Sequence, residues 1–158
     1  MTKELKQQYT LRITQANKTE LIVILYDMML SYIDEAKEAR EREDRAAFHD
    51  AVRKIRGCNQ ELLASLHLEY EPAMNLLSLY LYVNRELARA DIHFDMVCLE
   101  HVSLVVSGLR EAYAVLAEQD KSGAVMQNTQ TVYAGLTYGR GELTENMADQ
   151  GSNRGFLV

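Results

Sequence analysis

Residues 21–33, LIVILYDMMLSYI, decide the fold of this chain, because Asp27 and Ser31 are the only clearly polar residues among them. A helix on the surface of a small protein ordinarily has one apolar stripe and one polar face. Two stripes run along this stretch at helical spacing: Leu21, Leu25, Met28 and Tyr32 suffice for a core, and Ile22, Tyr26, Met29 and Ile33 form a second stripe beside it. The second stripe needs cover, either from this chain or from another protein.

The composition places the chain among ordinary globular proteins. Its 158 residues are 47% hydrophobic and 25% charged, which fits one domain with a self-sufficient core. The net charge of −6 argues against nucleic-acid and anionic-membrane partners. The apolar stretch is shorter than the roughly 20 residues that span a bilayer. The polar N-terminal residues do not resemble a secretion signal. We therefore expect the stretch to be buried in protein.

Four amphipathic helices follow from the periodicity. Asn17, with Glu20 in a capping box, predicts a helix that runs to about Arg42. Asp44 is a plausible cap for the next helix, and Pro72 fits the first turn of the third. Residues 90–95, ADIHFD, predict a short joint before the fourth. The expected fold is therefore all-α: an antiparallel four-helix bundle with a short N-terminal cap segment and a glycine-rich C-terminal extension. The apolar stripes of the second to fourth helices are Phe48, Val52, Ile55, Cys58, Leu62, Leu63 and Leu66; Ala73, Leu76, Leu77, Tyr80, Val83, Leu87 and Ala90; and Val102, Val105, Leu109, Ala112, Tyr113 and Leu116.

The domain boundary is expected near residue 120. Residues 1–120 form the predicted bundle, and residues 121–158 contain six of the eight glycines, at positions 123, 135, 139, 141, 151 and 155. This composition predicts an extension that is flexible or docked on the bundle. Its segment VYAGLTYG, residues 132–139, carries enough apolar side chains to suggest a built-in occupant for an apolar groove.

Catalytic, metal and phosphate sites find little support in the residues. No histidine has a glutamate three positions before it, as di-iron bundles require. Cys98 and His101 share a helical face, but two potential ligands are a weak metal signal, and the surroundings of His101 lack the lysine and glycine of a phosphate-accepting histidine. Cys58 and Cys98 read as reduced cytosolic thiols. We expect no enzyme activity, no metal and no cofactor.

The residues also carry a resemblance. The segment QYTLRITQANKTELIVILYDMMLSYIDEAKEA resembles the opening of the flagellar secretion chaperones of the FliS family. The likeness continues through AFHDAVRKIRGCNQELLASLHLE, NLLSLYLYVNRELARADIHFD and LEHVSLVVSGLREAYAVL, over roughly residues 5–117. Asn17-Lys18 stands where the family often has Ser-Pro, and Tyr113 where tryptophan is common. The family pattern of a tyrosine followed by Leu-Ile-x-x-Leu-Tyr-Asp is matched by Tyr9, Leu21, Ile22, Leu25, Tyr26 and Asp27.

The resemblance implies a cytoplasmic export chaperone without enzyme activity. Such a protein holds the disordered C-terminal segment of flagellin in an apolar groove, prevents premature polymerisation and helps delivery to the flagellar export gate. The N-terminal segment, through Tyr9, Leu11 and Ile13, would lie over part of this surface and move on binding. For each groove candidate, core packing is at least as good an explanation as partner contact. These candidates are Tyr9, Ile22, Tyr26, Ile55, Leu62, Leu76, Tyr80, Val83, Val102, Val106 and Leu109.

Two other readings remain open. A self-associating bundle would close the second stripe with another copy in a homodimer and would be a structural or adaptor protein without a client. A metal or phosphotransfer bundle would depend on His101.

Overall fold

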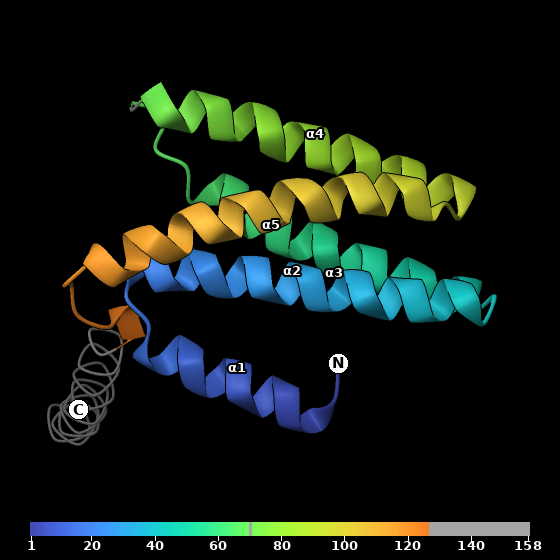
Figure 1. Cartoon of the computed structure of the whole chain (residues 1–158), viewed down its shortest axis with the longest axis horizontal. Coiled ribbons are helices and arrows are strands. Elements are labelled where there is room, and N and C mark those ends of the chain that lie inside the picture. Colours follow the sequence, from blue (N-terminus) through green and yellow to red (C-terminus); the bar gives the residue numbers. More distant parts are fainter. Residues whose placement is uncertain (70, 127–158) are drawn as a thin grey trace, which may run out of the picture.

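The computed structural model describes residues 1–69 and 71–126, and within these residues the chain is all-helical, which confirms the predicted class. Consecutive helices run in opposite directions (Figure 1). None of the helices in these ranges has the length and apolarity needed to cross a bilayer. The helices are α1 (Lys3–Gln15), α2 (Lys18–Glu41), α3 (Arg45–Ala64), α4 (Glu71–His93) and α5 (Met96–Gln119).

The predicted helix starts are confirmed. The Asn17 side chain accepts from the Glu20 amide while the Glu20 carboxylate accepts from the Asn17 amide, so the capping box is complete. Asp44 caps α3 by accepting from the Ala47 amide. The end of the third predicted helix differs: α4 continues to His93, so the joint before α5 is shorter than the expected residues 90–95.

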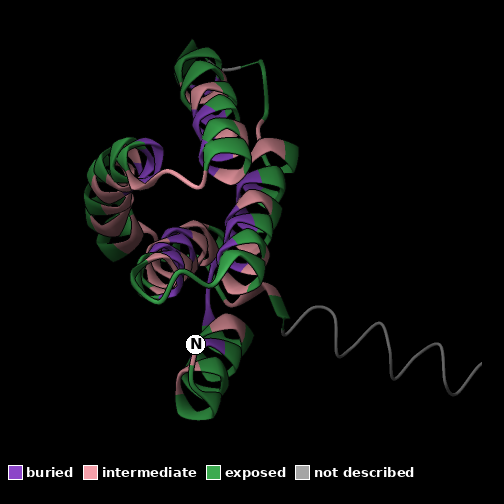
Figure 2. Cartoon of the chain, turned by 90° about the vertical axis from the view of Figure 1, so that its right-hand side faces the viewer, coloured by how far each residue is buried: buried purple, intermediate pink, exposed green. Residues whose placement is uncertain are grey.

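The N-terminal segment is the main departure from the expected four helices. Residues 3–15 form a helix of their own, α1, capped by the Thr2 hydroxyl. Figure 2 shows α1 set apart from the other helices and largely exposed. The remaining four pack around a shared core, in which α2 contacts α3 and α5, and α4 contacts the same two helices.

The order of the two stripes on α2 was predicted wrongly. Tyr26, Met29 and Ile33 are buried in the main core. Of the other stripe, Leu21 packs under α1, Met28 contacts both clusters, and Leu25 and Tyr32 are only partly buried against the main core. The reason lies downstream. The core stripe continues into Ala36 and Ala39, which are buried and small enough for close helix packing, while the other stripe continues into the charged Glu35.

A buried carboxylate joins α4 to α5. The Glu86 side chain accepts from His101 Nδ1 at 2.8 Å and from the Arg89 guanidinium at 2.9 Å, and the residue is only 3% exposed. These two donors, His101 first, hold the pKa of the Glu86 carboxyl below its usual value. Because a buried charge is costly unless it is paired, the ionised form of Glu86 depends on both partners.

We expect Glu86→Gln to flatten the acid side of the stability profile. A carboxyl whose pKa is lowered by folding stabilises the native state above the ordinary glutamate pKa, near about 4.3, and this stabilisation is lost as the pH falls through the folded pKa. Urea unfolding at several pH values between neutral and acidic measures the slope. Glu41→Gln, at an exposed residue, is the control and should keep the wild-type slope. An unchanged slope in the Glu86 variant would contradict the assignment.

Candidate partner-binding site

The helix α1 covers part of α2 through an apolar cluster that is separate from the main core. Tyr9 of α1, Ala16 of the joint and Ile24 of α2 are buried in it. The cluster is small, and α1 packs chiefly on α2. Of the five described helices, α1 is therefore the one held in place by the least buried surface. The partly buried members of the cluster are Met1, Leu5, Ile13, Leu21 and Met28. Leu11, expected to share this role, is instead exposed.

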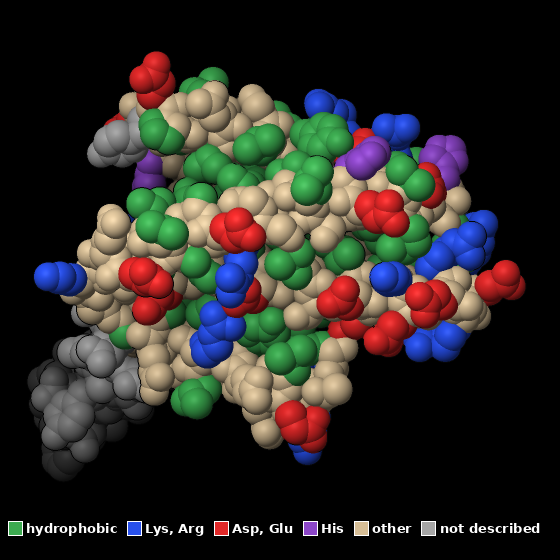
Figure 3. All heavy atoms as spheres, viewed as in Figure 1, with side chains coloured by type: hydrophobic (Ala, Val, Ile, Leu, Met, Phe, Trp, Pro, Cys, Tyr) green, Lys and Arg blue, Asp and Glu red, His purple; other side chains and the backbone are tan. Residues whose placement is uncertain are grey.

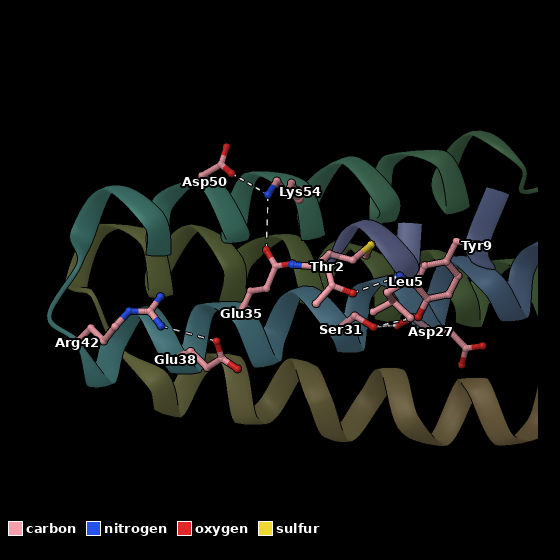
Figure 4. Close-up of polar contacts among 11 residues, drawn as sticks. Thr2, Leu5, Tyr9, Asp27, Ser31, Glu35, Glu38, Arg42, Asp50 and Lys54 are labelled. Atoms are coloured by element: carbon pink, nitrogen blue, oxygen red, sulfur yellow. Dashed lines mark hydrogen bonds and ion pairs between the residues drawn. The ribbon is translucent and has the colours of Figure 1, made fainter. Parts of the chain in front are cut away.

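Two polar contacts fix α1 above this cluster. Arg12 of α1 lies 2.8 Å from one Asp27 carboxylate oxygen, and Arg110 of α5 donates to the other at 2.8 Å. The hydroxyls of Tyr9 and Ser31 share a hydrogen bond of 2.9 Å, with Tyr9 pointing toward Ser31 in Figure 4. Asp27 and Ser31 are the only two clearly polar residues of the stretch LIVILYDMMLSYI. The interruptions in the apolar pattern are therefore the attachment points of α1.

Asp27 is the more important of these attachment points. Its side chain is only 14% exposed, and both of its carboxylate oxygens are paired with an arginine, which offsets the cost of withdrawing it from water. Reciprocally, the carboxylate raises the pKa of the Arg110 guanidinium. One carboxylate thus joins three helices, α1, α2 and α5.

The end of α5 holds the joint between α1 and α2. Beyond its capping role, Asn17 donates from Nδ2 to the Asp120 carbonyl oxygen at 3.2 Å, and the Thr19 hydroxyl donates to the Asp120 carboxylate at 2.6 Å. Hydrogen bonds from Ser122 and Thr19 lower the pKa of the Asp120 carboxyl to about 2. The amide of Val125 then donates to the Ala16 carbonyl oxygen at 3.0 Å. The joint is therefore a fixed point from which α1 extends.

A hollow of about 470 Å³ opens beside this joint, between α1, α2 and α5. The hollow exists because four of its apolar lining side chains are no larger than valine. Charged and amide side chains also line it. The volume lies within the range of ordinary ligand pockets. Its chemistry suits an apolar side chain with polar groups next to it. The lining residues are Arg12, Gln15, Ala16, Glu20, Val23, Ile24, Ala114 and Ala117.

The eleven groove candidates lie elsewhere. Tyr9 is buried in the α1 cluster. Seven others are buried in the main core: Tyr26, Ile55, Leu62, Tyr80, Val83, Val102 and Val106. Three are partly buried and pack against that core: Ile22, Leu76 and Leu109. None of the eleven lines the hollow. The sequence pattern did not identify the small alanines of the hollow as lining residues. Their contact with a partner stays a prediction.

A pair of tyrosines explains why two of these candidates are buried. The hydroxyls of Tyr26 and Tyr80 hydrogen-bond to each other at 2.5 Å inside the core. Burial raises the pKa of Tyr26, and it raises the pKa of Tyr80 to about 12. Each neutral hydroxyl can both donate and accept, so the pair satisfies polar groups that would otherwise be costly in the core.

The open apolar surface lies mainly on α4 and α5. Hydrophobic side chains gather over these two helices on the face shown in Figure 3. Helical spacing left all of these residues except Leu116 out of the predicted core stripes; Leu116 was placed in a stripe but is exposed. The exposed large apolar residues of the two helices are Met74, Leu79, Leu81, Ile92, Val97, Leu104, Val115 and Leu116.

The possible metal ligands are engaged in other contacts. His101 Nδ1 lies against Glu86 rather than Cys98. Cys58 and Cys98 are free and buried, and burial raises the pKa of both thiols, that of Cys58 to about 11. Among the described residues no three histidine, cysteine or acidic side chains gather as a metal site. The segment VYAGLTYG and most of the extension at 121–158 lie outside the described residues.

A helical bundle with a loosely covered apolar face has the architecture of a binding protein. Comparison with known proteins supports this class. A family model described as "Flagellar protein FliS" matches residues 1–120. The chain is also 27% identical over 109 residues to the flagellar secretion chaperone FliS of Bacillus subtilis (strain 168), covering 69% of this chain and 82% of the relative. The chain belongs to the FliS family of flagellar proteins.

Asp27→Asn should loosen α1 without unfolding the bundle. The substitution removes the charge that Arg12 and Arg110 share, and hydrogen bonds to charged groups contribute about 1.5–3 kcal/mol each. Amide hydrogen exchange in α1 should become roughly tenfold faster or more, since about 1.4 kcal/mol is a factor of ten. Asp50→Asn, which removes exposed ion pairs to Arg53 and Lys54, should leave α1 unchanged. Equal exchange in wild type and Asp27→Asn would refute the role of Asp27.

Asn17→Ala should destabilise the chain more than Asp44→Ala. Each substitution removes a helix cap, at a cost of typically about 1 kcal/mol. Asn17 additionally donates to Asp120, so its loss should cost about 1 kcal/mol more in the free energy of unfolding. Urea denaturation of the two variants gives the comparison. Equal losses would mean that the contact with Asp120 contributes nothing.

Proposed function

We propose that this chain is a flagellar secretion chaperone without enzyme activity. It binds the disordered C-terminal segment of flagellin in an apolar groove in the cytoplasm, prevents premature polymerisation, and helps deliver its client to the flagellar export gate. Membership of the FliS family and the name of the Bacillus subtilis relative support the chaperone role.

The observation that carries the proposal is the separate apolar cluster between α1 and α2. An apolar face covered by a thinly attached helix can be uncovered at small cost, since the main core around Tyr26 and Phe48 stays intact. A client that replaces α1 recovers the burial of Leu21, Ile24 and Met28 and reaches the walls of the hollow that α2 and α5 provide. Cover and client then compete for one surface.

The energetics suit a long client segment rather than a short one. Ordering a disordered segment costs about 2–5 kcal/mol of the gross interaction energy. Full burial of one large apolar side chain returns roughly 1.5–3 kcal/mol. Two such side chains, worth roughly 3–6 kcal/mol together, therefore only offset the ordering. A stable complex needs further anchors, which the hollow and the exposed apolar residues of α4 can receive.

The second candidate function is self-association. The apolar residues left open on α4, such as Leu81 and Ile92, are the observation that favours it. A homodimer closed through these residues would need no client. Light scattering of the purified protein, alone and with the flagellin segment, separates the two functions.

Calorimetry with the C-terminal flagellin segment of the same organism tests the proposal. Ala117→Arg places a long charged side chain at the hollow and should weaken binding roughly tenfold or more, because a buried unpaired charge is costly. Ala112→Arg puts the same side chain on an exposed position of α5 and should change little.

Two results would refute the chaperone role in this form. One is a dimer that ignores the flagellin segment. The other is a segment that binds wild type, Ala112→Arg and Ala117→Arg with equal affinity. Asp27→Asn should raise the affinity for the flagellin segment, because a loosened α1 competes less for the surface. Ala117→Arg should lower the same affinity.

A further inference from the structure

The outward side of α5 carries an apolar row that the described chain does not cover. Val97, Leu104 and Val115 are 52%, 77% and 57% exposed, and Gly108 completes the row. Successive members are seven, four and seven residues apart, so they line up along one side of the helix. The row is about 27 Å long at a rise of 1.5 Å per residue. It lies on the side of α5 opposite the groove candidates Val102 and Val106, which face the core.

Gly108 in the middle of this row has no role within the described chain. A Cβ built on it meets nothing within 4 Å, and the residue has no positive φ. Glycine inside a helix costs roughly 1 kcal/mol relative to alanine. Neither a turn nor an internal contact offsets that cost. Between Leu104 and Val115, however, the missing side chain leaves a notch in which a second backbone can approach closely.

An acidic row borders the apolar one. Glu100, Ser107, Glu111 and Glu118 each follow a member of the apolar row by three residues, so the two rows run in parallel. The three glutamates are exposed, and none of them forms an ion pair within the described ranges. Acidic side chains are spaced along α5 in Figure 3. The matching partner surface is an apolar row with lysine or arginine along one edge.

The acidic edge also argues against a second copy of this chain. When two identical helices pack antiparallel across a two-fold axis, like edges meet, so glutamates would face glutamates. Like charges placed together in an interface cost binding energy. The net charge of −6 adds to that repulsion.

The outer side of α4 carries a similar apolar row, but without a glycine notch. Met74, Leu81, Arg85 and Ile92 repeat the same seven, four and seven spacing, and the first, second and fourth are exposed apolar residues. Arg85 occupies the position that corresponds to Gly108, and its guanidinium lies 6.0 Å from the centre of the Tyr82 ring. A long charged side chain thus interrupts this row. It provides a matched control on the same molecule.

We infer that the outer face of α5, formed by Val97, Leu104, Gly108 and Val115 with its acidic edge, docks an amphipathic helix of a protein partner whose apolar row has a basic edge. Leu104 is the central anchor, and Gly108 receives a side chain of the partner. This surface is separate from the face under α1 and does not depend on the proposed function.

Binding of a designed helical peptide to the full chain tests the inference. The probe carries leucines at the same seven, four and seven spacing and lysines along one edge; a second peptide has glutamates in place of the lysines. The lysine peptide should bind, with an affinity that falls as salt rises because exposed charges are screened. Leu104→Glu should weaken it roughly tenfold or more, as expected for a central anchor. Leu81→Glu, the matched change on α4, should not.

A second pair of variants isolates the notch. Gly108→Gln and Gly57→Gln each replace an exposed helical glycine with nothing near its Cβ, so both should raise the melting temperature of the free chain. Only Gly108→Gln should weaken the lysine peptide, since Gly57 lies on the polar side of α3. Equal binding by these two variants would remove the notch from the proposal.

Four other results would overturn the inference. The first is equal binding of the lysine peptide by wild type and Leu104→Glu, and the second is binding of the glutamate peptide as tight as that of the lysine peptide. Light scattering could reveal self-association that Leu104→Glu abolishes, which would make a second copy the occupant. Competition by the flagellin segment would assign the face to the client instead.

Discussion

The carboxylate of Asp27 lies in the middle of a helix face that is otherwise apolar, and the placement of α1 depends on it. A charge that is mostly withdrawn from water has to be paired. Its partners, Arg12 and Arg110, come from opposite ends of the described chain and bring α1 and α5 to one point on α2. The ion pairs therefore contribute as much as the apolar contacts to keeping α1 over the apolar surface around this point.

This arrangement separates the stability of the bundle from the attachment of its cover. The main core is closed by α2 to α5, and within it the Tyr26 and Tyr80 hydroxyls satisfy each other. The α1 cluster contains only three buried residues. A binding surface that must be kept from water until a client arrives is well served by such a cover, because the exchange of cover for client leaves the larger core untouched.

Several features of the fold were predictable because they are local. The caps Asn17 and Asp44 and the core stripe of α3 follow from hydrogen-bonding groups and spacings within one helix. The assignment of the two stripes on α2 failed because both have the same periodicity. Only the packing of Ala36 and Ala39 against neighbouring helices distinguishes the core stripe from the covered one.

The sequence by itself determined the all-helical class, the start of each long helix and the existence of more apolar surface on α2 than one core requires. These properties depend on residues within a few turns of each other. The tertiary structure decided which stripe faces the core, that residues 3–15 form a helix over the other, and that a hollow lies beside Ala16. Asp120, Arg110 and Ala117 reach this region from about a hundred residues away. Contacts over that separation leave no periodic mark in a single sequence, so they became visible only once the helices were packed.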